Sequence, residues 1–536
     1  MKQFRKLTII FLFACSLAFY SCADWLSIHP RDQVLEELQF STELRINSAL
    51  NGIYRAMAQD NLYGEFLTQT YIEYLARYYN FVNTGVPIPA LVAWSLTARF
   101  DFTQDEVRRM SQNIWNSAYR TILDINVFID NVSTSDAVRE SRRDVLLGEA
   151  YALRAFLHFD MFRLFGPVMK LDPDDPLTIP FSDSRQVISR DPLPAAVVIE
   201  RILRDLTTAE RLLENDPIRT RGVNDNYPQV SRSPGLTSET IFAEYFRNRR
   251  MNYYAVRALR ARVLLHARRF DEAAALAAEV LEEATRTHEG DGRFFQWETD
   301  WAGQIIPMNN FVFYNEVLFG ISNPNLHTNW VRLFDGTTAG THVFAEHNLF
   351  ANIFADFPIR DLITITQTDI RAGQFRQSNI PPGVSTGTGA GHTFISTKFR
   401  RPAFDYNSAT DHRVRYLINF QPLIRLSELL FIQAEAAIEA GDAALAAEKI
   451  NYVRARRRGT AEQLLPPTAE METIQAALMR EVYREFVGEG QAFFFLKRNA
   501  KTRIFSGFNQ TQTVILEENI RSTYVVPLPD SETIVG

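Results

Sequence analysis

The sequence predicts an all-α protein, an array of packed helices interrupted by one loop-rich, irregular segment that contains short strands. Three observations carry this prediction. Residues 146–168 are apolar on almost every side of a helical projection, which is typical of a buried helix. Residues 254–284 and 426–457 are alanine-rich, and each contains a turn, as expected of antiparallel helix pairs. Between these pairs, residues 287–415 lose the helical period and are rich in Gly, Asn, Thr, Pro and aromatic residues.

The helix predicted over residues 146–168 carries small residues along one face. At helical spacing, this face consists of the small residues Gly148, Ala152 and Ala155, followed by Phe159. Small side chains let a second helix approach closely. We expect the helix to end at Gly166, which can take the left-handed conformation, and at Pro167, which cannot continue a helix.

The same periodicity predicts the other helices. Residues 48–57 place an apolar face at Leu50, Ile53, Tyr54 and Met57. Residues 113–132 form an amphipathic helix that we expect to pair with residues 146–168, and residues 192–214 form the next helix. Residues 71–99 mix tyrosines with Asn, Gly and Pro, so we expect a helix end followed by an aromatic loop.

The two alanine-rich helix pairs resemble tetratricopeptide repeats. Their turns fall near Arg269 and Gly441, and their second helices contain the similar runs LAAEVL and LAAEKI. In such repeats alanine permits close approach while larger residues fill the gaps. We therefore expect a helical-repeat architecture, with residues 287–415 as an irregular subdomain packed on it.

The N-terminus has the arrangement of a secretory signal peptide. Basic residues precede an apolar run over residues 7–20, and Ser21 and Cys22 follow it. The run is too short for a convincing transmembrane helix. We expect Cys22 to become the acylated first residue of a lipoprotein. Cys15 fits the usual small-residue rule better, but apolar sequence continues past it.

Composition narrows the function classes. The 536 residues are 46% hydrophobic and 22% charged, which is ordinary for a well-packed globular protein. Removing residues 1–21 removes three positive charges and no negative ones, so the formal net charge changes from −6 to −9. An acidic surface argues against nucleic acid as a partner. Cys15 and Cys22 are the two cysteines, so processing and acylation leave no thiol for a disulfide or a metal site.

Several separated blocks resemble the SusD/RagB family. The signature helix of that family matches Glu149, Leu153, Arg154, Ala155, Phe156, Phe159, Asp160, Arg163, Phe165, Gly166, Pro167 and Val168. Its C-terminal block matches Arg480, Glu481, Glu485, Phe486, Gly488, Glu489, Gly490, Gln491, Phe494, Leu496, Lys497 and Arg498. Ala492 and Phe495 replace the usual basic residue and Asp, which puts an ion pair of the relatives in doubt. Residues 524–532 resemble the terminal segment of the family.

This resemblance implies a non-enzymatic lipoprotein of the outer membrane, exposed at the cell surface, that binds a nutrient oligomer beside a SusC-like TonB-dependent transporter. The nutrient is usually a glycan, although peptide-binding relatives exist and the sequence does not choose between them. The expected organisation is a signal peptide (1–21), an N-terminal helical region (22–286), the irregular subdomain (287–415) and a C-terminal helical region (416–536). Two alternatives of other classes are a surface hydrolase and a structural helical-repeat scaffold.

No motif for catalysis or for a cofactor stands out. Residues 383–387 satisfy the G-x-S-x-G formula, but two prolines precede them and a Gly/Thr run follows, which favours a loop over a nucleophile elbow. The histidines are scattered, so no metal site is expected. Acidic residues that would suit calcium, although solvated loop acids are commoner, are Asp172, Asp174, Asp175, Glu289, Asp291, Glu298 and Asp300.

The candidate ligand-binding residues are aromatic and amide side chains in non-periodic sequence. An aromatic ring offers a flat face to the apolar C–H side of a sugar, and Asn binds hydroxyl groups. The candidates are Tyr78, Tyr79, Asn80, Asn83, Trp94, Trp297, Trp301 and Trp330. They fall in two stretches about 200 residues apart, and both interrupt the helical pattern. Because interruptions of a stacked array emerge as loops, we expect the two stretches to form one platform.

Overall fold

The computed structural model describes residues 36–81, 89–186, 191–223, 246–286, 294–298, 311–334, 342–344, 346–355, 369–378, 393–399, 419–457, 463–505, 512–515 and 517–529. Cys22, Asn83, Trp301 and the G-x-S-x-G run lie outside these residues, so the expectations for them stay predictions.

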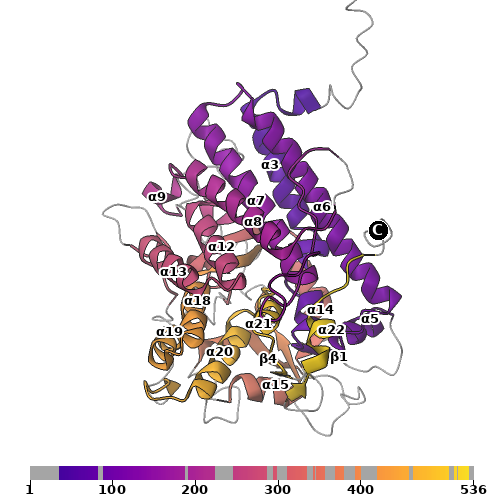
Figure 1. Ribbon diagram of the computed structural model, residues 1–536, viewed down its shortest axis with the longest axis vertical. Helices are drawn as coiled ribbons and strands as arrows, with labels where there is room; N and C mark the ends of the chain where they lie inside the picture. The colour runs from indigo at the N-terminus through magenta and orange to yellow at the C-terminus, as the bar shows by residue number, and fades with distance from the viewer. Residues whose placement is uncertain are drawn as a thin grey trace, which may run out of the picture.

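Long helices form the body of the molecule, as Figure 1 shows. They are α3 (Glu43–Met57), α6 (Asp105–Ser133), α7 (Glu140–Phe165), α8 (Ala195–Leu212), α12 (Tyr253–His266), α13 (Phe270–Ala284), α18 (Leu426–Glu439), α19 (Ala443–Arg456) and α20 (Met471–Glu485). Each packs on the next, from α6 on α7 through α8, α12, α13 and α18 to α19 and α20. This confirms the all-α, tetratricopeptide-like class.

Helix α7 is the central packing element, as its apolar periphery predicts. Gly148 lies against α8, where an added Cβ would meet Leu213 Cγ at 2.7 Å, so the small-residue face does permit close helix packing. The expected left-handed stop at Gly166 is wrong, because its backbone is extended, with φ −77° and ψ −178°. Glycine is needed there for space instead, since a Cβ would lie 2.5 Å from the carbonyl oxygen of Phe162.

Both predicted helix pairs are present, and their turns use different residues at the left-handed position. Gly441 has φ +78° between α18 and α19, whereas Arg268 has φ +62° between α12 and α13. Side chains cap one helix of each pair at its N-terminus: Asn252 accepts from the amide of Ala255 at the start of α12, and Asp442 accepts from that of Leu445 at the start of α19. Such caps satisfy amides that the first turn of a helix leaves free.

Short helices connect the array to the strands. They are η1 (Asp60–Gly64), α4 (Tyr71–Leu75), α5 (Pro89–Ala98), α9 (Ile218–Arg221), η2 (Arg247–Arg249), η3 (Tyr314–Glu316), α14 (Leu326–Phe334), α15 (Glu346–Ile353), η4 (Ile370–Gln374), α21 (Ala492–Arg498), η6 (Glu517–Asn519) and α22 (Ile520–Tyr524). The aromatic loop expected after the helix end at 71–75 is partly helix α5. Its sequence, PALVAWSLTA, has proline at the first helical position and then good helix formers.

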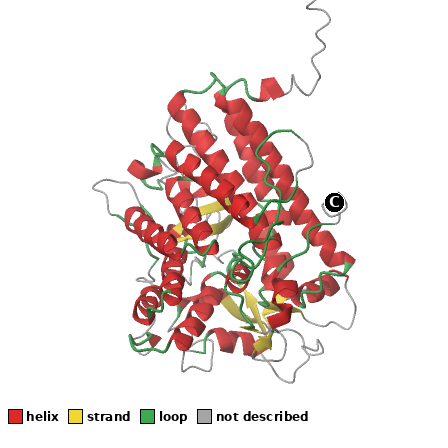
Figure 2. Cartoon of the chain, in the orientation of Figure 1, coloured by secondary structure: helices red, strands yellow, loops and turns green. Residues whose placement is uncertain are grey.

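Within the described ranges, the strands, yellow in Figure 2, form three small antiparallel sheets. One has the order β1 (Tyr79–Phe81), β3 (His342–Phe344), β5 (Thr393–Ser396), β4 (Phe375–Ser378). The others pair β2 (Val317–Ser322) with β6 (Phe420–Arg425), and β7 (Arg503–Phe505) with β8 (Gln512–Val514). The irregular segment thus joins residues from both helical regions through its sheets. Among the described residues, no helix is both long and apolar enough to cross a membrane.

Candidate functional site

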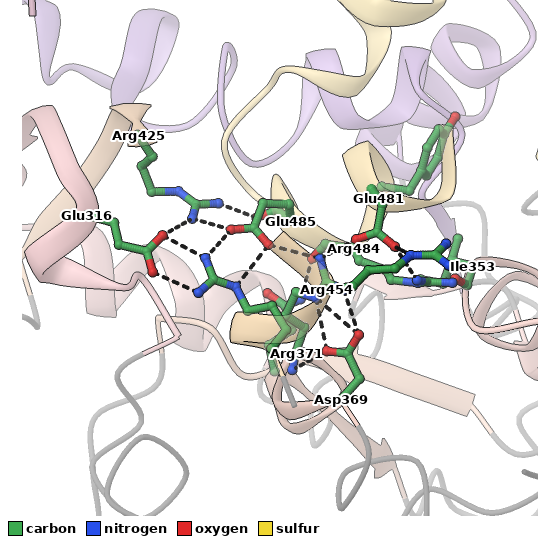
Figure 3. Close-up of polar contacts among 12 residues, drawn as sticks. Glu316, Ile353, Asp369, Arg371, Arg425, Arg454, Glu481, Arg484 and Glu485 are labelled. Carbon is green, nitrogen blue, oxygen red and sulfur yellow. Dashed lines mark hydrogen bonds and ion pairs between the residues drawn. The ribbon is translucent and has the colours of Figure 1, made fainter. Parts of the chain in front are cut away.

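A buried ionic network lies where the end of α20 meets η3, β6, η4 and the end of α19, and Figure 3 shows part of it. Its carboxylates are Glu316, Asp369, Glu481, Glu485 and Glu489, and its cations are Arg371, Lys398, Arg425, Arg454, Arg457 and Arg484. All of these side chains are buried. Three of the carboxylates belong to the C-terminal block that the sequence singles out.

Glu485 is the centre of this network. Its Oε1 accepts from Arg425 at 2.7 Å and from Arg457 at 2.6 Å, while its Oε2 accepts from Arg371 at 3.0 Å. Burial by itself raises the pKa of a carboxyl group, but the guanidiniums of these arginines outweigh it and hold the pKa of Glu485 well below its ordinary value. The group is therefore ionised and acts as a structural anion.

Glu481 repeats this arrangement one helical turn earlier. It accepts from Arg371 at 2.7 Å, from Arg454 at 2.8 Å and from Arg484 at 2.6 Å. Burial raises its pKa, and the three arginines more than offset this, so that the pKa of Glu481 falls to about 2. Neither carboxylate has an exposed oxygen for a substrate, and we assign the network a positioning role.

What the network positions is the segment that carries Trp297. The amide of Glu298 donates to Glu316 Oε1 at 2.9 Å, and the carbonyl of Glu298 accepts from Arg457 at 3.4 Å. Arg457 and Glu316 also form a bidentate pair at 2.7 and 2.6 Å. The amide of Gln296 donates to the carbonyl oxygen of Asn315 at 3.0 Å. A short segment without regular structure is thus held on one side of Trp297 by a buried ion pair and on the other by a backbone hydrogen bond.

At the surface above this anchor, Trp297, Tyr452 and Arg456 form a cluster that we call the Trp297 surface. The rings of Trp297 and Tyr452 meet edge to face with centroids 5.5 Å apart. The guanidinium of Arg456 lies 5.0 Å from the Trp297 centroid and 3.4 Å from that of Tyr452. Trp297 is half-buried, and Tyr452 is exposed with 39% of its surface open to solvent. The cluster therefore presents flat apolar surface beside a hydrogen-bond donor.

The Trp297 surface suits recognition of a hydroxylated ring. Aromatic faces pack on apolar C–H groups, and a guanidinium donates to hydroxyl oxygens in a fixed plane. Burial against the rings lowers the pKa of Arg456, but arginine stays protonated at any physiological pH. The backbone of Tyr452 fixes Arg456 further, because its carbonyl accepts from the guanidinium at 3.1 Å. The cluster is therefore ordered before any ligand arrives.

Tyr78 and Tyr79, two of the predicted ligand-binding residues, lie in the core and not on an exposed loop. The hydroxyl of Tyr78 donates to the carbonyl oxygen of Tyr483 at 2.8 Å, and the Tyr78 ring packs on that of Tyr483. Tyr79 packs between Tyr74 and Phe334. Both side chains are at most 1% exposed, so the prediction that Tyr78 and Tyr79 belong to a surface platform for ligand binding is wrong.

Trp94 and Trp330 are also packed inside. Trp94 lies on α5 and stacks on Tyr74 with centroids 5.3 Å apart. Trp330 lies on α14, and its indole N–H donates to the carbonyl oxygen of Ser396 at 2.7 Å. Both are at most 8% exposed, so neither offers a face to solvent. The cause is the unexpected helicity of these segments, which turns their rings toward the core.

Among the predicted ligand-binding residues whose side chains the structure describes, Trp297 is the one that lies at the surface. The backbone of Asn80 pairs with that of Val343 in the sheet, while its side chain, Asn83 and Trp301 lie outside the described residues. Sequence analysis missed Tyr452 and Arg456, because α19 was read only as a packing helix. Their spacing of four residues was an available signal, since it places both on one face of that helix.

The described residues contain no group of three or more His, Cys, Asp or Glu side chains that could hold a metal ion. Of the acidic residues considered for calcium, Asp172 pairs with Arg521 at 2.7 Å, and Asp175 accepts from the amide of Leu177 at 3.1 Å. These contacts give the two carboxylates ordinary structural roles.

Two family models match the chain. Residues 381–533 match the model described as the SusD family, and residues 24–224 match one described as starch-binding associating with outer membrane. Two SusD-like proteins of Formosa agariphila are similar in sequence. One is 23% identical over 159 residues, which is 30% of this chain and 29% of the relative, and the other is 28% identical over 228 residues, 40% and 39%. The matched part thus spans well under half of each relative.

Solved structures match over nearly the whole chain. A SusD superfamily protein of Bacteroides thetaiotaomicron has a TM-score of 0.60 at 21% identity, over 92% of this chain and 98% of that one. A SusD-like carbohydrate binding protein of Bacteroides vulgatus has a TM-score of 0.63 at 16% identity, over 92% and 96%. These likenesses establish the fold. The two family models identify residues 24–224 and 381–533 as SusD/RagB family sequence.

Proposed function

We propose that this protein is a non-catalytic, lipid-anchored binding protein of the outer membrane that captures a glycan at the cell surface and passes it to a TonB-dependent transporter. The observation that carries the binding role is the Trp297 surface, where two rings and a guanidinium lie in contact and open to solvent. The descriptions of the matching family and structures, which name starch and carbohydrate, support a glycan over a peptide.

The energetics agree with a capture role. A well-placed aromatic contact contributes about 1 kcal/mol, so two rings give a modest affinity that suits repeated binding and release. The N–H groups of Arg456 would orient the ligand by donating hydrogen bonds to its hydroxyl oxygens. A binding protein that hands its ligand on gains nothing from very tight binding.

The geometry also supports binding without cleavage. Glycoside hydrolysis needs two carboxyl groups beside the bound sugar. Two described carboxylates belong to or contact the segment of Trp297: Glu298, whose Oε1 accepts from the amide of Asn315 at 3.1 Å, and Glu316, which is buried in its pair with Arg457. Both have structural partners.

The test is a titration of the parent protein and of Trp297→Ala and Tyr452→Ala with a panel of neutral oligosaccharides and oligopeptides. We expect a glycan to bind, and each variant to weaken its affinity about fivefold with an unchanged melting temperature. Trp330→Ala is the matched core control, and we expect it to lower the melting temperature. Unchanged affinity of both surface variants for every ligand would place the site elsewhere, and tighter binding of peptides would reverse the ligand class.

Two further measurements address catalysis and location. Product analysis after prolonged incubation should show intact oligosaccharide, and accumulation of fragments that depends on one carboxylate would refute the binding role. Cys22→Ala should release the protein from the membrane fraction, because acyl chains contribute about 0.8 kcal/mol per buried methylene to an anchor. Co-purification with a TonB-dependent transporter would support the hand-over step.

A further inference from the structure

A groove of about 310 Å³ lies between α8 and α12 and reaches the turn before α13. The three helices lie side by side in the array, as Figure 1 shows. The residues that line it are Glu200, Leu203, Arg204, Thr207, Thr208, Arg260, Leu264 and Arg269. None of them belongs to the Trp297 surface or to the buried network. Its volume is at the lower end of the range for small-ligand sites.

The lining follows from helical spacing. On α8, residues 200, 203, 204, 207 and 208 fall on one stripe, and on α12, Arg260 and Leu264 are one turn apart. Leu203 and Leu264, both less than 10% exposed, form an apolar floor. Polar side chains form the walls. The groove is therefore amphipathic across its width.

The walls of the groove carry guanidinium groups. Three arginines and one glutamate line the groove. Each arginine pairs with acidic side chains: Arg204 with Asp183 at 3.4 Å and Asp205 at 3.8 Å, Arg260 with Glu210 at 2.9 Å, and Arg269 with Glu272 at 2.7 Å and Glu200 at 3.3 Å. All three arginine side chains are at least 35% exposed, and exposed pairs contribute little. Within the described residues, Nε of Arg260 is covered and has no hydrogen-bond partner.

The two threonines add acceptors. Their hydroxyl groups donate to the carbonyl oxygens of Leu203 at 2.8 Å and Arg204 at 2.9 Å. The hydroxyl protons are thus used within the helix, and the oxygen lone pairs face outward as acceptors. A ligand that complements the groove carries an anionic group for the guanidiniums, hydroxyl groups for the threonines and an apolar face for the leucines.

We propose that this groove binds a carboxylate- or sulfate-bearing saccharide unit. Guanidinium forks bind such anions in a bidentate manner. An acidic peptide would match the arginines as well, and we choose the saccharide because the matching family model is described as starch-binding. The proposal rests on the proposed glycan-binding function and narrows its ligand class to acidic glycans.

The experiment titrates the full chain at low and at physiological salt with three acidic oligosaccharides: oligogalacturonate, oligomannuronate and chondroitin sulfate oligomers. Neutral oligosaccharides of the same length serve as comparison ligands. We expect at least one acidic ligand to bind and its affinity to fall as salt rises, because the charges are exposed. The double variant Arg204→Gln/Arg260→Gln should weaken this binding at least tenfold. Arg211→Gln, an exposed arginine on α8 outside the groove, should leave it unchanged.

Each other outcome overturns the assignment. If neutral glycans bind through Trp297 but no acidic ligand binds, the groove proposal falls and the proposed function stands. If no oligosaccharide of either kind binds, both fall. If acidic binding is lost in Trp297→Ala but kept in the arginine double variant, the anion lies on the Trp297 surface. Equal binding of polyglutamate, lost in the double variant, would make the groove a site for acidic peptides.

Discussion

Arginine plays opposite roles in two regions of this molecule. In the buried network, Arg371, Arg425 and Arg457 are fully covered and share Glu485. Along the groove between α8 and α12, Arg204, Arg260 and Arg269 form ion pairs at the surface. Removing a carboxylate from the first region leaves several charges in a low dielectric, whereas removing one from the second returns an arginine to water. The same residue type is therefore structural in one place and available to a ligand in the other.

The largest effect is expected for Glu485→Gln. This change leaves three guanidiniums with a neutral acceptor, and breaking a buried pair in this way costs about 3–5 kcal/mol. Chemical denaturation of the parent and the variant measures the loss. Glu272→Gln, which removes an exposed carboxylate, is the control. A loss below about 1 kcal/mol for Glu485→Gln would erase the distinction between the two regions.

The second prediction concerns acid stability. The pKa of Glu481 is about 2 in the folded protein against an ordinary value of 4.5, so its carboxylate form stabilises the fold. This stabilisation is fully present above pH 4.5 and is lost as the pH falls toward 2, a change of about 3 kcal/mol. Unfolding free energies measured across this window should fall more steeply for the parent than for Glu481→Gln. Parallel pH profiles would contradict the assignment.

The sequence predicted the helical array because its signals are local. Periodicity located α6, α7 and the two helix pairs, and the family resemblance marked Glu481, Glu485 and Glu489. The sequence could not show that some of their partners come from strands and turns 60 or more residues away, such as Arg425 at 60 residues from Glu485 and Arg371 at 110 residues from Glu481. Ion pairs of this kind are set by tertiary packing.

The ligand-binding residues were harder to predict for a related reason. The loss of helical period predicts exposed loops. In the structure, however, the side chains of Tyr78, Trp94 and Trp330 fill space between elements that pack on one another. Exposure depends on which neighbours arrive from elsewhere in the chain. Trp297 stays half-buried because the buried network fixes its backbone while its ring also meets Tyr452 and Arg456 of α19, which are themselves exposed or half-buried.

The third prediction concerns Arg268, a partly exposed residue whose backbone has an unfavourable left-handed conformation. Arg268 has φ +62°, a conformation that costs a non-glycine residue about 1 kcal/mol, and its pair with Glu439 at 3.1 Å is partly exposed. Arg268→Gly should therefore stabilise the protein by about 0.5–1 kcal/mol, since the strain relieved exceeds the pair lost. Thermal melts measure the gain, and Gly441→Ala, at the matching turn, should destabilise. A lower melting temperature for Arg268→Gly would show that the exposed pair matters.

The smallest effect is expected for Arg269→Gln. Arg269 pairs with Glu272 at 2.7 Å and with Glu200 at 3.3 Å, and 39% of its side chain is exposed. Surface pairs of this kind contribute about 0.2–1 kcal/mol, and salt screens them further. Denaturation at low and at high salt should show a loss below about 0.5 kcal/mol that shrinks with added salt. Arg371→Gln is the buried counterpart and should cost several times more at either salt concentration, because its partners Asp369, Glu481 and Glu485 remain covered. Equal losses of unfolding free energy for the two variants would mean that burial does not distinguish the two regions. The arginines of the groove would then be held too firmly by their carboxylates to exchange them for a ligand.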